Sequence, residues 1–236
     1  MLRLHEEFKG IYGYRRLTMN VNRSLGKNYN HKRIYRLMKS ANIKSVIRRK
    51  KKRYISSTAS ITAENVLKRE FSEDRPNVKW LTDVTEFKLT NGKKAYLSAI
   101  LDLGDRSIVS YVLGNSNNNP LVFQTFDQAL ASNPQAKPLF HSDRGFQYTN
   151  AQFKSKLDNA GMTQSMSRIG RCIDNGPMEG FWGTLKSEMY YLRKFHTYEE
   201  LKQAVDSYME FYNERRLQKN LKCLTPIEYR NQALSA

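Results

Sequence analysis

The sequence predicts an α/β protein in which a mixed sheet, begun by three antiparallel strands and flanked by helices, follows a small basic helical segment. Two observations support this division. Strand-like apolar runs and a hairpin signal at Asn91-Gly92 occur after residue 77. Before that point the chain has a dense positive charge and apolar residues at helical spacing. We therefore expect the two parts to have different tasks.

The order of elements after residue 77 defines the expected sheet. Strands are expected at Val78–Leu89, Ala95–Leu103 and Ile108–Leu113, and a fourth ends with Leu139 and Phe140. Helices are expected at Leu121–Ala131, Asn150–Ala160 and Thr197–Glu214, and another begins near Pro177. Three antiparallel strands followed by helix, strand and further helices is the order expected of a ribonuclease H-like core.

Charge is distributed unevenly along the 236 residues. The chain has 40 Lys and Arg against 22 Asp and Glu, a formal net charge of +18. Residues 1–54 contain 17 of these cations and two acids, a net charge of +15, which leaves +3 for the rest. This asymmetry indicates a nucleic-acid-binding front segment joined to a near-neutral body.

The two cysteines, Cys172 and Cys223, have no metal-ligand spacing and favour a reducing compartment. No apolar run reaches the roughly 18 residues that a membrane helix needs, and no signal peptide is visible. We therefore expect a cytoplasmic protein without a membrane partner.

Two short helices are expected in the front segment. Leu17, Val21 and Leu25 form one stripe of a helix from Tyr14 to Leu25, which Gly26 can end. A second helix follows the N-cap Asn30. It places Ile34, Leu37 and Met38 inward and leaves outward the basic residues His31, Lys32, Arg33, Arg36 and Lys39. The pattern is compatible with a DNA-binding helix-turn-helix, and equally with a helical hairpin that has a solvated basic face.

A run of six cations follows the second helix: Arg48, Arg49, Lys50, Lys51, Lys52 and Arg53. Like charges at this density oppose packing, so the run reads as a linker or arm that contacts the phosphate backbone without reading sequence. We expect a basic helical segment at residues 1–47, a basic linker at 48–76, and a catalytic core with C-terminal helices at 77–236.

Three carboxylates are placed on rigid elements of the expected core. Asp83 lies at the centre of the first strand, Asp143 directly follows the fourth, and Glu179 begins a helix after Asn-Gly-Pro. Elements of this kind can aim three carboxylates at one point. Oxygen ligands suit Mg²⁺, which takes few protein carboxylates together with substrate phosphates. The pattern favours two-metal phosphodiester chemistry.

Other residues compete for roles in this site. Asp102 is expected to shape the following turn or to pair with Arg106, and Asp174 suits a turn or helix cap. Glu188 falls about two and a half helical turns after Glu179, well along the helix from a site at its start. We interpret His141 as a support for Asp143. Lys186 either reaches the DNA backbone or is an exposed helix lysine.

Motifs along nearly the whole chain resemble bacterial insertion-sequence transposases of the Asp-Asp-Glu type, insertion sequence family three, second reading frame. They are Tyr-Gly-Tyr-Arg-Arg-Leu at 12–17, His-Lys-Arg-Ile-Tyr-Arg-Leu-Met at 31–38, Trp-Leu-Thr-Asp-Val-Thr at 80–85, His-Ser-Asp-Arg-Gly-Phe-Gln-Tyr at 141–148, Ser-Met-Ser-Arg-Ile-Gly-Arg-Cys-Ile-Asp-Asn at 165–175, Phe-Tyr-Asn-Glu-Arg-Arg at 211–216 and Leu-Thr-Pro-Ile-Glu at 224–228. One departure is Gln218, where this family usually has His, which puts in doubt whatever that His supports.

The resemblance implies a retroviral-integrase-like core in which Asp83, Asp143 and Glu179 are the catalytic and metal-binding residues. It implies Mg²⁺ or Mn²⁺ as cofactor, two ions, with cleavage at the element ends and strand transfer of 3′-hydroxyls into target DNA. It further implies a nucleoid-associated homo-oligomer on DNA, joined to a DNA-binding protein from an upstream frame, and an N-terminus that starts inside its module. The stretch at residues 165–171 is expected to be a mobile loop that contacts DNA.

Two alternatives remain at this stage. A catalytically inactive DNA-binding regulator derived from a transposase would explain the charge but not the intact carboxylates. A plain metal-dependent nuclease would explain the carboxylates but not the basic arm and the tail motifs.

Overall fold

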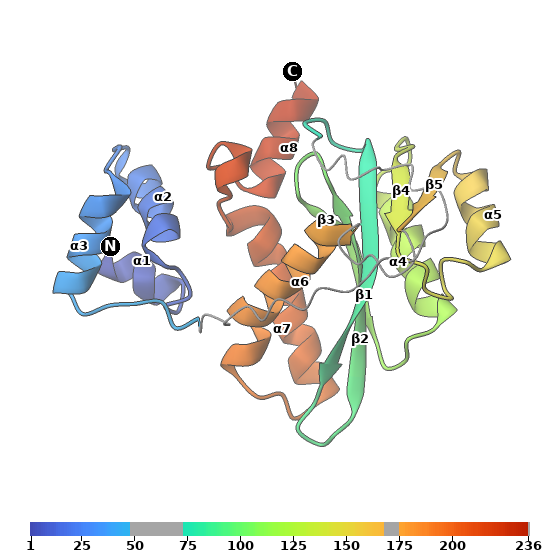
Figure 1. Cartoon of the computed structure of the whole chain (residues 1–236), viewed down its shortest axis with the longest axis horizontal. Coiled ribbons are helices and arrows are strands. Elements are labelled where there is room, and N and C mark those ends of the chain that lie inside the picture. Colours follow the sequence, from blue (N-terminus) through green and yellow to red (C-terminus); the bar gives the residue numbers. More distant parts are fainter. Residues whose placement is uncertain (48–72, 168–174, 236) are drawn as a thin grey trace, which may run out of the picture.

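The computed structural model of this chain describes residues 1–47, 73–167 and 175–235. A module of short helices at the N-terminus lies beside a larger unit built on a single sheet (Figure 1). The sheet has five strands in the order β3-β2-β1-β4-β5. The expected α/β class, with a mixed sheet that follows a helical segment, is confirmed.

Pairing in the sheet changes from antiparallel to parallel at β1. The strands are β1 (Lys79–Lys88), β2 (Lys94–Asp102), β3 (Ile108–Gly114), β4 (Leu139–Ser142) and β5 (Thr163–Met166). β1 to β3 form an antiparallel meander, whereas β4 pairs parallel with β1 and β5 parallel with β4. The central strand is therefore β1, with a neighbour on each side.

Helices cover both faces of the sheet (Figure 1). One face carries α4 (Asn119–Ser132) and α5 (Ala151–Asn159), and the other carries α6 (Gly176–Glu188), α7 (Tyr198–Glu210) and α8 (Pro226–Ser235). Each face has its own apolar core, because side chains alternate across a strand. Trp80 belongs to the α4–α5 core and Leu81 to the α6–α7 core.

The C-terminal region is built from short helical pieces. Between the longer helices lie the 3-10 turns Tyr190–Leu192 and Lys219–Leu221 and the π-helical turn Phe211–Arg215. Thr197 and Glu200 form a capping box at the start of α7, which fixes the N-terminus of the helix expected there. Gln218 pairs with Leu224 in an isolated bridge.

The N-terminal module consists of α1 (Leu2–Glu7), α2 (Tyr14–Leu25) and α3 (His31–Ser40). Gly26 ends α2 in the left-handed region at φ 60°, and the Asn30 side chain accepts a hydrogen bond from the Lys32 backbone N–H. Both capping predictions are confirmed. The sequence pattern gave no sign of α1.

Two apolar positions of the module were predicted wrongly. Leu25 and Leu37 are 57% and 45% exposed, whereas Leu17, Val21 and Ile34 are buried. The contact between two short helices is narrow, and Leu25 is the last residue of α2. On α3 the stripe of residues four apart faces the partner helix, which leaves Leu37 beside the contact rather than in it.

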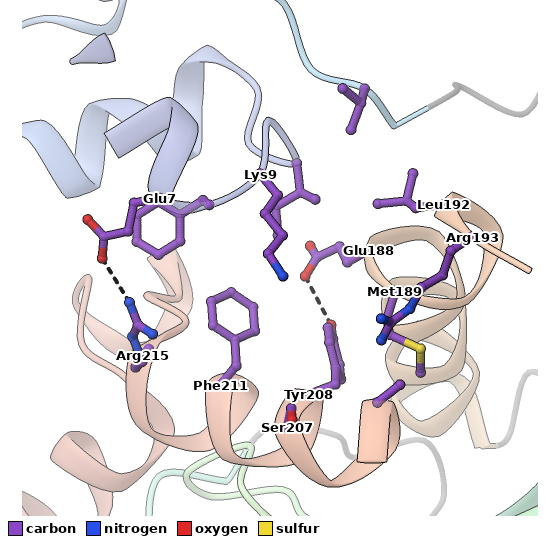
Figure 2. Close-up of a pocket in the computed structure, with 14 residues that line it drawn as sticks. Glu7, Lys9, Glu188, Met189, Leu192, Arg193, Ser207, Tyr208, Phe211 and Arg215 are labelled. Atoms are coloured by element: carbon purple, nitrogen blue, oxygen red, sulfur yellow. Dashed lines mark hydrogen bonds and ion pairs between the residues drawn. The ribbon is translucent and has the colours of Figure 1, made fainter. Parts of the chain in front are cut away.

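The module packs against the α6–α7 side of the core. The ring of Phe8 lies 6.2 Å from that of Phe211, and Arg215 forms an ion pair with Glu7 at 2.8 Å. A cavity of about 590 Å³ separates α1 from α7 beside these contacts, and Figure 2 shows Glu7 and Arg215 pointing toward each other at its edge. The cavity therefore lies at the junction of the two units, away from the three predicted carboxylates, none of which lines it.

Residues 48–72 of the expected linker, including the cation run, lie outside the described residues. The proposed boundaries at 47 and 77 stay predictions. Within the part that the structure describes, no helix is both long and apolar enough to cross a membrane.

Candidate active site

Asp83 lies in the middle of β1, opposite Ala99 of β2. Its carboxylate is half-buried and oriented by two donors. The Val84 backbone N–H donates to Oδ1 at 2.8 Å, and the Trp182 indole Nε1–H donates to Oδ2 at 3.0 Å. Because a central strand and a buried ring supply these donors, the first predicted carboxylate has a fixed orientation.

Asp143 follows the last residue of β4. β4 runs parallel to β1 with His141 opposite Leu81, so Asp143 and Asp83 each come two residues after a paired position. The register therefore brings the middle of β1, with Asp83, to the same level as the end of β4, where Asp143 follows. Asp143 is exposed, and its Oδ1 accepts a hydrogen bond from the Gly145 N–H at 2.8 Å.

Gly145 allows the turn after Asp143 to close tightly. A Cβ at this position would lie 3.0 Å from Asp143 Oδ1 and 2.9 Å from Gln147 Oε1. A side chain here would therefore push against the carboxylate of Asp143. Glycine at this position allows that carboxylate to stay where it is.

Glu179 lies in the first turn of α6 and is exposed. The start of this helix is attached to β1, because the Asn175 side-chain amide donates to the Thr82 backbone oxygen at 3.0 Å. Thr82 directly precedes Asp83 in β1. Glu179 is thus carried by a helix whose N-terminal end is fixed beside the first carboxylate.

The three predicted carboxylates act on one another electrostatically. Burial, with a smaller contribution from the nearby carboxylates of Asp143 and Glu179, raises the pKa of Asp83 to about 6, although the hydrogen bonds from Val84 and Trp182 act to lower it. The charged groups that act most strongly on this pKa are both acids.

A metal-ligand set is not preformed. Among the described residues no three His, Cys, Asp or Glu side chains are grouped as metal ligands. The structure brings Asp83, Asp143 and Glu179 into one region without closing them on a single point, and their role in metal binding stays a prediction.

The competing acids have other partners. Asp102 is buried, its Oδ1 accepts from the Gly104 N–H at 2.8 Å, and it forms an ion pair with Arg230 at 3.3 Å. Its predicted role in the turn is confirmed. Glu188 pairs with Arg216 at 2.8 Å and accepts a hydrogen bond from Tyr208, which Figure 2 shows. Asp174 lies outside the described residues.

His141 belongs to β4 and is fully buried. Its Nδ1 lies 2.9 Å from Ser165 Oγ and its Nε2 lies 3.1 Å from Ser167 Oγ. The ring thus joins β5 to the strand that ends before Asp143, and its role as a support for Asp143 stays a prediction. The predicted mobile loop is wrong for residues 165 and 166, because they belong to β5 and share its backbone pairing with β4. Residues 168–171 lie outside the described residues.

The predicted DNA-binding residues fall into three groups. Lys32, Arg33 and Arg36 are exposed on α3, as expected. Lys186 is half-buried, with its Nζ 5.3 Å from the centre of the Phe87 ring. The remaining group, Arg48, Arg49, Lys50, Lys51, Lys52 and Arg53, lies outside the described residues.

Two contacts of the site were not found from the sequence. Trp182 donates to Asp83, and Asn175 attaches α6 to β1. The spacing of Trp182, three residues after Glu179, was a signal for the first, since residues three apart share a helix face.

Family comparisons agree with this arrangement. An integrase core domain family matches residues 73–172, a second integrase core domain family matches residues 179–234, and an HTH-like domain family matches residues 1–51. Among solved structures, the HTLV-2 integrase catalytic core domain in complex with magnesium superposes with a TM-score of 0.53 at 19% identity, covering 67% of this chain and 99% of that one. The larger unit is therefore an integrase catalytic core of the ribonuclease H-like class.

Relatives identify the family more narrowly. The putative transposase InsK for insertion sequence element IS150 of Escherichia coli (strain K12) is 46% identical over 97% of this chain and 81% of its own length. The transposase for IS904 of Lactococcus lactis is 34% identical over 94% of this chain and 88% of its own. The chain belongs to the bacterial insertion-sequence transposases of family three. It is a DNA transposase, a polynucleotidyl transferase that acts on phosphodiester bonds.

Proposed function

We propose that Asp83, Asp143 and Glu179 form the catalytic centre of this transposase and bind two divalent cations. The observation that supports this most directly is the setting of Asp83. It is a half-buried carboxylate, and the charged groups that act most strongly on its pKa are two further acids. Such a cluster is unfavourable by itself and is stabilised by a hard cation with oxygen ligands, such as Mg²⁺ or Mn²⁺.

When bound, the two ions would activate the attacking oxygen and stabilise the leaving oxygen of an in-line displacement at phosphorus. The chain supplies the positions. Asp83 contributes an oriented carboxylate from the central strand, Asp143 one from a tight turn, and Glu179 one from the first turn of a helix. The two reactions would be cleavage at the element ends and transfer of the freed 3′-hydroxyls into target DNA.

Single substitutions test this assignment. Asp83→Asn, Asp143→Asn and Glu179→Gln keep the side-chain size but remove a charge from the cluster. Each should slow cleavage of end DNA by about 10²-fold or more, because transition-state charge loses its stabiliser. Circular dichroism and DNA binding should stay unchanged. The matched control Glu188→Gln changes a carboxylate in the same helix that pairs with Arg216.

A near wild-type rate for Glu179→Gln, together with a slow Glu188→Gln, would reassign the third ligand. Retained cleavage by all three variants would remove the proposed centre altogether.

We further propose that the exposed cations of α3 and the run at residues 48–53 bind the DNA backbone, with Lys186 as a further contact on α6, the helix that carries Glu179. Each phosphate neutralised adds about 0.9 to the slope of log affinity against log salt. Replacing Lys32, Arg33 and Arg36 by Ala should therefore flatten that slope by up to about 3. Replacing the exposed Lys154 and Lys202, which pair with Asp residues on their own helices, should leave it unchanged.

For partners, we propose that the active form is a homo-oligomer on DNA in the bacterial nucleoid, assisted by an upstream-frame protein with a further DNA-binding module. Strand transfer by this chain alone should be weak and should rise when that protein is supplied. Sedimentation with and without end DNA measures the assembly, and efficient sequence-specific transfer by the chain alone would contradict the need for a partner.

A further inference from the structure

The two tryptophans of this chain both donate their indole N–H to an aspartate. Trp182 donates to Asp83 Oδ2 at 3.0 Å, and Trp80 donates to Asp102 Oδ2 at 3.2 Å. We infer that Trp182 is a positioning residue of the active site, which orients the Asp83 carboxylate for the divalent cation. The inference rests on the proposed role of Asp83 as a metal ligand.

The hydrogen bonds that the Asp83 carboxylate accepts favour this role for Trp182. Each oxygen of the carboxylate accepts one N–H, from Val84 at Oδ1 and from Trp182 at Oδ2. A carboxylate oxygen has two lone pairs, so each retains one for a cation. The two donors are held by a strand and by a buried ring, and together they determine where the free lone pairs point.

The ring of Trp182 is itself held firmly. It is 6% exposed, belongs to the core between the sheet and α6–α7, and lies 5.0 Å from the ring of Phe181. A buried indole that reaches a partner with its N–H is a stiff donor. The backbone N–H of Val84 is adjacent to Asp83 and cannot fix the far oxygen. Trp182 therefore supplies the orientation that the strand alone lacks.

Trp182 also connects two of the three carboxylates. It lies three residues after Glu179 on α6, so both project from neighbouring positions of one helix face. A shift of α6 that moved Glu179 would stretch the bond from Trp182 to Asp83. The same indole thus holds Glu179 at a fixed position relative to Asp83.

The substitution Trp182→Phe removes the N–H and keeps most of the ring. Loss of a residue that orients a metal ligand commonly weakens metal affinity by about 10- to 100-fold. We expect the Mg²⁺ concentration for half-maximal cleavage of end DNA to rise by about 10-fold or more. At saturating Mg²⁺ most of the rate should return, which a role in fold stability would not produce.

Trp80→Phe is the matched control. It makes the same change beside Asp102, a carboxylate that already has a cation partner in Arg230. Its Mg²⁺ dependence should equal that of the wild type, although its melting temperature should fall. An equal shift in both variants would show that the effect on Mg²⁺ is a general consequence of a loosened sheet and would overturn the inference.

Binding can be followed without activity, since each variant keeps a single tryptophan. In Trp80→Phe the remaining indole is Trp182, and added Mn²⁺ should change its fluorescence with saturation. Addition of Asp83→Asn should abolish that change. In Trp182→Phe the remaining Trp80 should not respond. A saturable response from Trp80, or none from Trp182, would overturn the inference.

Failure of the inference can be told apart from failure of the catalytic assignment. If Asp83→Asn cleaves DNA normally, the assignment itself is wrong. If Asp83→Asn is inactive while Trp182→Phe has the wild-type Mg²⁺ dependence, Asp83 remains a ligand and only the positioning role is lost.

Discussion

Asp83 and Asp102 lie on neighbouring strands, and burial raises the pKa of each to about 6. Each accepts an indole N–H. Their charged surroundings differ. Asp102 and its neighbour Asp105 share the guanidinium of Arg230, which reaches them at 3.3 and 2.7 Å. The charged groups that act on Asp83 are the acids Asp143 and Glu179.

This difference agrees with the proposal that Asp102 is a structural carboxylate and Asp83 a functional one. Arg230 on α8 also donates to the side-chain oxygens of Asn77 and Asn133, so the cluster around Asp102 attaches the C-terminal helix to the sheet with its charges compensated inside the chain. Among the described residues, the charged groups that act most strongly on the pKa of Asp83 are instead two acids. The two acids therefore have similar pKa values but different charged surroundings, and the surroundings of Asp83 support the proposal that it binds a metal ion.

The largest effect on stability is expected when Arg230, the cation that pairs with Asp102 and Asp105, is removed. Arg230→Met should lower the free energy of unfolding by about 3 to 5 kcal/mol, because it leaves buried acids without their cation. Urea denaturation measures this. The matched control Arg215→Met removes an exposed pair with Glu7 and should cost far less. A small loss for Arg230→Met would mean that Asp102 and Asp105 do not depend on it.

Titration of Asp102 gives the next largest effect. Burial, with the neighbouring carboxylate of Asp105, raises the pKa of Asp102 from 3.8 to about 6. The folded chain therefore keeps this proton at pH values where the unfolded chain has lost it. Stability from this group is present below pH 4 and declines as the pH rises to about 6, a change of up to about 3 kcal/mol.

The comparison of wild type with Asp102→Asn isolates that change, because all other groups titrate in both. Urea denaturation between pH 4 and 7 should show the wild type losing stability relative to the variant as pH rises. A constant difference across this range would contradict a raised pKa for Asp102.

Asp83→Asn should affect catalysis rather than stability, which is the opposite of what we expect for substitutions around Asp102. It should lower the rate of end cleavage by about 10²-fold, or about 2.7 kcal/mol in activation free energy. It should change the free energy of unfolding little, because the amide relieves repulsion from Asp143 and Glu179 but has only one oxygen to accept the N–H groups of Val84 and Trp182. Asp102→Asn should keep its rate per folded molecule. A variant of Asp83 that is destabilised but active would reverse the two roles.

Much of this comparison was accessible from the sequence. The strand signals around Asn91-Gly92 and the apolar run before Asp143 predicted β1, β2 and β4, because these strands are apolar and bounded by turns. Asp102 could be set aside as a candidate metal ligand because it precedes a turn, which favoured Asp83, Asp143 and Glu179. The structure agrees with that reading of Asp102.

The parts that escaped prediction depend on contacts between distant residues. β5 is a short strand, Thr-Gln-Ser-Met, without an apolar run, and it is stabilised by backbone pairing with β4 and by serines that meet His141. The partner of Asp102 is 128 residues away in Arg230. The indole that meets Asp83 lies 99 residues later. No local period encodes such distances.

The smallest effect on stability is expected for a carboxylate near the surface. Glu228 on α8 pairs with Arg23 of the N-terminal module, and both side chains are more than a third exposed. The hydrogen bond from Arg23 lowers the pKa of Glu228 to about 2. This pair therefore stabilises the docked module above the ordinary pKa of a glutamate, and the contribution is lost as pH falls toward 2.

Because water and salt screen this pair, its contribution should be small. A double-mutant cycle with Arg23→Ala and Glu228→Ala should give a coupling of about 0.2 to 1 kcal/mol, which decreases further in high salt. The same cycle on the exposed pair of Lys154 and Asp158 provides the reference. The module should stay docked in every variant, since Phe8 still packs on Phe211. A coupling near that of a buried pair would mean that charge, rather than aromatic packing, holds the module to the core.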